Sequence, residues 1–218
     1  MGNQTVTADK KTHLQHHFVD ADQQFESSKL GMWIFLVTEV LMFGGLFVAY
    51  IIYRSWHPDL FQLAAKELNT ILGATNTVVL IASSLTIALA IRNVQLDKIK
   101  ASINYMATTI ALAGVFMVIK YIEYTEKFAK GIFPGNAYYY DGIDHSMASN
   151  FFSIYYMMTG LHGIHVLMGM ALISWMILKA KRGAVHSSYY TPVENTGLFW
   201  HLVDIIWIFL FPLLYLID

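Results

Sequence analysis

Residues 31–53 constrain this chain more than any other stretch. They form a run of mostly apolar residues about as long as the ~20 residues that an α-helix needs to cross a hydrocarbon layer. Glu39 interrupts the run roughly a third of the way along. A carboxyl group at that depth costs about 3 kcal/mol on insertion scales, so it should face other helices and be paired or protonated. The stretch therefore predicts a helical bundle around it.

The composition indicates a membrane-embedded chain. Hydrophobic residues make up 56% of the sequence and charged residues only 13%, whereas soluble domains carry about 25% charged residues. The net charge of −1 gives no basic surface of the kind that nucleic-acid binding requires. Cysteine is absent, which excludes disulfides, thiolate metal sites and a dinuclear copper centre built on thiolates.

The hydropathy pattern predicts an all-α integral membrane protein with five transmembrane helices. A polar tail at residues 1–29, without the apolar core of a signal peptide, precedes one transmembrane domain at residues 30–218. His57-Pro58-Asp59 indicates a turn in the connection after the first helix, because proline disfavours helix at the residue before it. The helices are expected at about residues 31–53, 68–91, 103–124, 149–178 and 196–217.

Positive charge is distributed unequally between the two sides of the predicted bundle. One side holds nine of the 14 Lys and Arg residues, and this excess is typical of the cytoplasmic side. We therefore expect the N-terminus inside and the C-terminus outside. The nine residues are Lys10, Lys11, Lys29, Arg92, Lys98, Lys100, Lys179, Lys181 and Arg182.

Four ionisable groups are expected in the inner half of the hydrocarbon layer, from a rise of about 1.5 Å per helical residue. They are Glu39, His162, His201 and Asp204. We predict that Glu39 bonds to a histidine of another helix, either His162 or His165. His201 and Asp204 lie on one stripe of the last helix, where they can pair. Both a structural role, holding helices together, and a role in proton handling stay open.

Three basic residues, Lys179, Lys181 and Arg182, close the fourth predicted helix. They suit contact with anionic lipid headgroups, and a plain topology signal explains them equally well. Lys120 and Glu123 share a face near the outer boundary, where a lysine is expected to extend toward the interface.

The histidines also allow two metal-binding interpretations, a haem site and a di-iron site. His162 and His165 share a helix face but are too few for a closed metal site; with His201 they could hold haem, as in a b-type cytochrome. Residues 13–17 (HLQHH) resemble one histidine box of membrane di-iron oxygenases. That box stands alone, outside the predicted membrane domain, so a solvated tail is the preferred interpretation.

Four segments, in the same order along the chain, resemble characteristic segments of subunit III of haem–copper respiratory oxidases. The resemblance covers the chain from about Lys29 to its end. The segments are residues 38–43 (TEVLMF), 120–124 (KYIEY), 160–166 (GLHGIHV) and 200–210 (WHLVDIIWIFL).

The resemblance implies a redox-inactive accessory subunit of a proton-translocating terminal oxidase, which reduces O2 to water in aerobic respiration in the bacterial cytoplasmic membrane. It implies no catalytic residue, haem or copper on this chain. Haem and copper would reside on subunit I, its direct partner, with subunits II and IV in the same complex, which could itself join a larger respiratory supercomplex.

The family is associated with bound phospholipid, oxygen access, complex stability and sustained proton uptake. Within it, Glu39 matches a carbodiimide-reactive carboxyl discussed as proton-related, and Lys179 falls where a basic residue meets a lipid headgroup. The chain resembles the short five-helix form, without two additional N-terminal helices. A quinol oxidase, rather than a cytochrome c oxidase, is the alternative complex.

Overall fold

The structure is an assembly of long helices, as the sequence predicts. The computed structural model describes residues 15–16, 18–143, 148–187 and 189–217. Within these ranges five helices are long and apolar enough to cross a membrane, and no β-strand is present. They are α2 (Ala21–Trp56), α4 (Thr70–Gln95), α5 (Ile99–Ala129), α6 (Ala148–Lys181) and α7 (Thr191–Tyr215), with the shorter α3 (Pro58–Ala65) and η1 (Gly135–Ala137) between them.

The helices extend beyond the apolar segments, because polar residues outside the hydrocarbon layer continue them. α2 begins at Ala21 rather than near Gly31, and the Asp20 side chain caps it by accepting a hydrogen bond of 2.7 Å from the backbone N–H of Gln23. The connection expected as a turn at Pro58 is the short helix α3, with Pro58 in its first turn. Leu60 and Phe61 of α3 are buried, which explains why this polar-looking connection is ordered as a helix.

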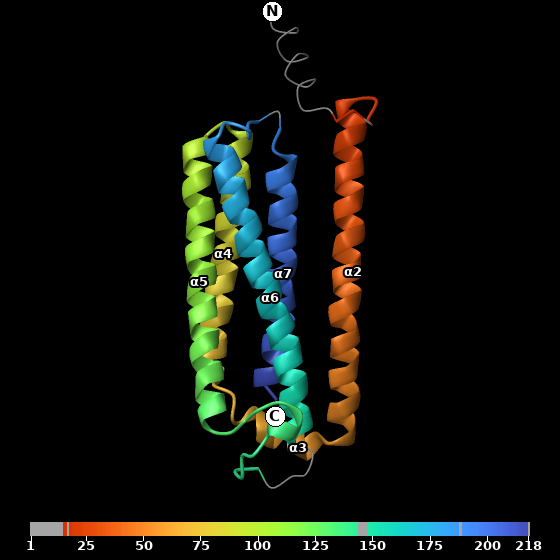
Figure 1. Cartoon of the computed structure of the whole chain (residues 1–218), viewed down its shortest axis with the longest axis vertical. Coiled ribbons are helices and arrows are strands. Elements are labelled where there is room, and N and C mark those ends of the chain that lie inside the picture. The colour runs from red at the N-terminus through yellow and green to blue at the C-terminus, as the bar shows by residue number, and fades with distance from the viewer. Residues whose placement is uncertain (1–14, 17, 144–147, 188, 218) are drawn as a thin grey trace, which may run out of the picture.

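Four helices form a compact bundle, and the fifth stands beside it. Figure 1 shows α4, α5, α6 and α7 packed together, with α2 set to one side. In the most apolar stretch of α7, 50% of the residues are buried, against 17% in α2. α7 is therefore the central helix of the bundle, and α2 presents most of its apolar surface outward.

Both ends of α2 are tied to α7 by polar contacts. Near the start of α2, the Lys29 ammonium lies 3.4 Å from the Glu194 carboxylate, and the Asn195 amide donates to the Ser28 hydroxyl at 3.0 Å. Near the other end, the Tyr50 hydroxyl donates to the backbone carbonyl of Leu213. These contacts position α2 where apolar packing alone is sparse.

On the side of the bundle where α4 ends and α7 begins, two connections meet. Asp97, between α4 and α5, accepts hydrogen bonds from the Ser187 hydroxyl at 2.6 Å and the Ser187 backbone N–H at 2.8 Å. These bonds lower the pKa of the Asp97 carboxyl below its ordinary value. The contact joins the α4–α5 connection to the α6–α7 connection.

Indole groups and a glycine bring α7 close to its neighbours. The Trp200 and Trp207 indole N–H groups donate to Ser83 at 3.0 Å and Thr77 at 3.1 Å, both on α4. A Cβ atom added at Gly169 of α6 would lie 2.6 Å from the Trp200 ring, which is fully buried. Gly169 is therefore required for the close approach of α6 and α7, in the way that small residues commonly permit it in membranes.

We predict that Gly169→Ala destabilises the detergent-solubilised protein by about 1–3 kcal/mol, because the added methyl group overpacks the Trp200 site. Gly163→Ala in the same helix is the matched control, since a Cβ there meets no atom within 4 Å. The measurement is the free energy of unfolding from denaturant titration. Equal effects of the two substitutions would contradict the packing argument.

Candidate functional site: polar groups buried in the bundle

The structure brings Glu39 of α2 and His165 of α6 together. His165 Nε2 lies 2.9 Å from a Glu39 carboxyl oxygen. His165 Nδ1 lies 2.8 Å from the backbone carbonyl of Leu161, which can only accept, so Nδ1 carries a proton and donates it. The Nε2–Glu39 bond then contains one proton, held either by the carboxyl group or by an imidazolium. The arrangement can accommodate a proton on either partner without moving a heavy atom.

His162, the other histidine considered as a partner for Glu39, lies in a different environment. Its ring is fully buried between the edge of Phe116, at a centroid distance of 5.6 Å, and Trp207, at 5.4 Å. Neither ring nitrogen has a hydrogen-bond partner among the residues that the structure describes. His162 is thus part of the aromatic core of the bundle, and His165 is the histidine that Glu39 reaches.

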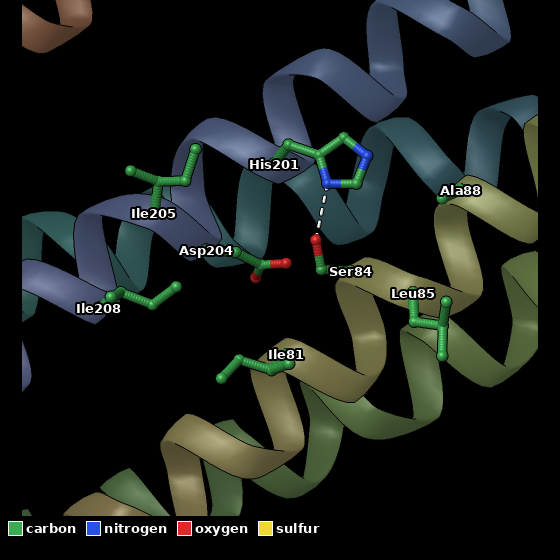
Figure 2. Close-up of a pocket in the computed structure, with 8 residues that line it drawn as sticks. All are labelled: Ile81, Ser84, Leu85, Ala88, His201, Asp204, Ile205 and Ile208. Carbon is green, nitrogen blue, oxygen red and sulfur yellow. Dashed lines mark hydrogen bonds between the residues drawn. The ribbon is translucent and has the colours of Figure 1, made fainter.

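His201 and Asp204 do not bond to each other, although both lie on the face of α7 toward α4. His201 Nδ1 lies 2.7 Å from the Ser84 hydroxyl of α4. Asp204 is buried (2% exposed) beside the same Ser84 hydroxyl, and neither of its carboxyl oxygens has a well-formed hydrogen bond within the described part of the chain. Figure 2 shows both side chains directed toward the space between α7 and α4, with Ser84 between them.

These groups line a cavity of about 410 Å³ between α4 and α7. Most of its lining is apolar, and the polar atoms come from one serine, one histidine and one aspartate. The cavity is lined by Ile81, Ser84, Leu85, Ala88, His201, Asp204, Ile205 and Ile208.

The described residues contain no group of three His, Cys, Asp or Glu side chains placed to hold a metal ion. Both ring nitrogens of His165 already bond to protein atoms. A haem iron would therefore have to displace Glu39 or Leu161 to use this ring. Of the possible histidine box at residues 13–17, His13 and His17 lie outside the described residues.

A buried ionic group, the Glu123 cluster, was not predicted. Glu123 accepts hydrogen bonds from the ammonium groups of Lys120 at 2.9 Å and Lys127 at 3.0 Å. It also accepts from the hydroxyls of Tyr155 on α6 at 3.0 Å and Tyr215 on α7 at 2.7 Å. Four donors therefore satisfy one carboxylate, and the cluster joins α5, α6 and α7.

The expectation that Lys120 extends to the interface was wrong. Its side chain turns inward, where the ammonium lies 2.6 Å from the Tyr215 hydroxyl and 4.8 Å from the Trp207 ring centroid. The Glu123 carboxylate and these aromatic faces offset the free-energy cost of removing the Lys120 ammonium from water. A signal was present in the sequence, because Lys120, Glu123 and Lys127 follow spacings of three and four that place them on one helix face.

The three basic residues considered for headgroup contact lie at the end of α6. Lys179 and Lys181 are in its last turn, and Arg182 follows. The Lys179 ammonium lies 4.2 Å from the ring centroid of Trp175, which is itself half-exposed. An ammonium beside an exposed indole is typical of a membrane interface, and the contact with lipid headgroups stays a prediction.

Comparison with known proteins places these features in a family. A sequence model of the family "Cytochrome c oxidase subunit III" matches residues 8–218. A cytochrome c oxidase subunit 3 from Thermostichus vulcanus is 33% identical over 190 residues, which cover 86% of each chain. A probable quinol oxidase subunit 3 from Staphylococcus aureus strain USA300 is 24% identical over 217 residues, covering 100% of this chain and 97% of that one.

The name of a third relative combines subunits I and III. The heme-copper oxidase subunit I+III of Aeropyrum pernix is 27% identical over 197 residues, which make up 85% of this chain and 22% of that protein.

We predict that Glu123→Gln destabilises the protein by about 3–5 kcal/mol, because it leaves two buried ammonium groups without their counter-charge. Glu126→Gln is the matched control: Glu126 pairs with Lys130 at 3.2 Å, but its side chain is 54% exposed, and such a pair contributes about 0–1 kcal/mol. Thermal unfolding in detergent, followed by size-exclusion chromatography, compares the two. Similar losses from both substitutions would show that the cluster contributes no more than a surface pair.

Proposed function

This chain belongs to the cytochrome c oxidase subunit III family and is a subunit of a haem–copper oxidase complex, and we propose that it serves there as a redox-inactive accessory subunit. In this role it supports proton uptake, complex stability, lipid binding and oxygen access while another subunit reduces O2 to water. The observation that carries the proposal is the hydrogen bond between Glu39 and His165. These two side chains share one proton within the membrane span.

A proton-holding pair suits a supporting role in an enzyme that consumes and translocates protons. Glu39 lies on α2, the helix with the least buried apolar stretch, so the pair is near the outer surface of this subunit. Protons that enter the complex near this surface can exchange with the pair without an electron carrier on this chain. The structural alternative, in which Glu39 and His165 only fix α2 against α6, uses the same contact and is separated by the turnover experiment below.

The partner that we propose for direct contact is subunit I, with subunits II and IV in the same complex. The Aeropyrum pernix relative carries subunits I and III in one name, which supports their proximity. α2 exposes Trp33, Ile34, Val37, Val40 and Leu41, an apolar surface suited to another subunit or to lipid. Relatives named for both cytochrome c and quinol oxidases keep either electron donor open.

We propose the bacterial cytoplasmic membrane as the location, with the N-terminus inside. The starts of α2, α5 and α7 and the ends of α4 and α6 lie on one side, and this side holds most of the basic residues, as the cytoplasmic side does. Lys179, Lys181 and Arg182 would then meet phospholipid headgroups of the inner leaflet.

Purification of the tagged chain from mild detergent tests the proposal. We expect a haem-containing subunit I to co-purify, identified by mass spectrometry and by the haem absorption spectrum of the complex. The chain separated from its partners should show no Soret band. A Soret band in the separated chain would favour a b-type cytochrome, and two bound irons per chain would favour a di-iron oxygenase.

We predict that Glu39→Gln leaves the initial rate of oxygen consumption close to that of the native complex but shortens its lifetime under turnover. Glutamine keeps the shape of the side chain but cannot hold the shared proton. Glu26→Gln, at an exposed position of the same helix, is the control. Loss of all oxidase activity in an assembled Glu39→Gln complex would contradict a supporting role, and an unchanged lifetime would leave Glu39 with the structural role alone.

A further inference from the structure

The Glu123 cluster carries one more positive charge than negative charge. Lys120 and Lys127 each place an ammonium group against the single Glu123 carboxylate, at 2.9 and 3.0 Å. Within the described part of the chain these are the only ion pairs of the two lysines, and the phenols that α6 and α7 add, Tyr155 and Tyr215, are neutral. The three charged side chains are between 1% and 8% exposed, so water and salt screen the excess charge poorly.

The cluster lies across one end of the bundle. Glu123 and Lys127 are in the last two turns of α5, and Tyr215 is the last residue of α7. Tyr155 lies about 10 Å along α6 from the first residue of that helix. Figure 1 shows these ends of α5, α6 and α7 on the side of the C-terminus. The excess positive charge is therefore placed between the interior of the bundle and that side.

A row of polar side chains on α6 leads from the cluster to the Glu39–His165 bond. Its members follow one another at spacings of four, three and three residues, which keeps them on the buried side of the helix. The first member donates to Glu123, and the last bonds to Glu39, about 15 Å farther along the helix axis. The row consists of Tyr155, Thr159, His162 and His165.

His162 has the atoms that a proton relay requires. Neither of its ring nitrogens bonds to another described residue, so one nitrogen can receive a proton while the other releases one. Its ring lies 5.4 Å from Trp207, measured between ring centroids, and the Lys120 ammonium lies 4.8 Å from the centroid of the same Trp207 ring. A proton that moves along the row toward the cluster therefore meets like charge and is repelled.

We propose that the Glu123 cluster is an electrostatic barrier that closes one end of a buried proton-exchange row. The row joins the Glu39–His165 pair to His162, and the net positive charge prevents protons from passing between His162 and the C-terminal side of the membrane. The inference rests on the proposed function and deepens it, because it assigns the side with which the pair exchanges its proton. Fixed positive groups exclude protons from membrane pores by the same repulsion.

Proton leak through the intact complex tests the barrier. The oxidase is reconstituted into vesicles that contain a trapped pH-sensitive dye, and the decay of an imposed pH gradient is measured without turnover, with valinomycin and potassium present to remove the membrane potential. Lys127→Met removes the excess charge and leaves Glu123 paired with Lys120. We expect the gradient to decay about tenfold faster in this variant than in the native complex. Lys127→Gln also removes the charge but keeps a hydrogen-bond donor, and serves if the methionine variant does not assemble.

Two control variants separate charge from side-chain loss. Lys127→Arg keeps the positive charge at the same position. Lys130→Met removes a positive charge from the same end of α5, but the Lys130 side chain is 42% exposed and pairs with Glu126. We expect the leak in both controls to stay within about twofold of the native leak. An unchanged leak in the charge-removing variants of Lys127, or an equal increase in Lys130→Met, would overturn the barrier.

The double variant Lys127→Met with His162→Phe tests the row itself. Phenylalanine fills the site beside Trp207 and cannot carry a proton, so we expect the leak to return to near the native value. A loosened bundle would stay leaky in the double variant, and that result would overturn the role of His162.

The haem spectrum and the co-purifying subunits are recorded on the same samples, which separates the two proposals. An assembled oxidase with the same leak in all variants overturns the barrier and leaves the proposed function intact. A chain that purifies without any oxidase subunit overturns both.

Discussion

The cost of a charged or polar side chain in a hydrocarbon layer determines how this bundle is built. Glu39, Glu123 and Asp204 lie in three different helices, and each has a different environment. Glu123 is surrounded by four donors from three helices, and Glu39 shares one proton with His165. Asp204 lies beside the Ser84 hydroxyl, without a well-formed hydrogen bond among the described residues. Glu123 joins three helices, Glu39 joins α2 to α6, and Asp204 is enclosed between α7 and α4.

α7 connects these environments. Tyr215 near its end donates to Glu123, and Trp200 and Trp207 donate to α4. Asp204 and His201, which lie between Trp200 and Trp207 in the sequence, line the groove between α4 and α7. α7 thus combines a buried face in the core of the bundle with a face that borders the mostly apolar groove. This arrangement suits a subunit whose role is to support a larger complex.

α2 has the opposite character. Polar contacts at its two ends and the Glu39–His165 bond in its middle fix it beside the bundle, while much of its apolar surface faces outward. Its position therefore depends on a few hydrogen bonds more than on close packing. An outward-facing apolar surface of this size is typical of contact with lipid or with other protein.

The lengths of the apolar segments predict five membrane helices, and the cost of a charged group in hydrocarbon predicts that Glu39 faces inward. The position of each residue along its helix predicts a histidine at a similar depth. The ends of the helices and the α3 connection were not predictable in this way, since capping and the burial of Leu60 and Phe61 decide them. Rotation of each helix about its axis is a property of tertiary packing. His162 and His165 differ by about 60° around α6. Only the packed bundle decided that His165 meets Glu39, that Lys120 turns inward, and that His201 bonds to Ser84 rather than to Asp204.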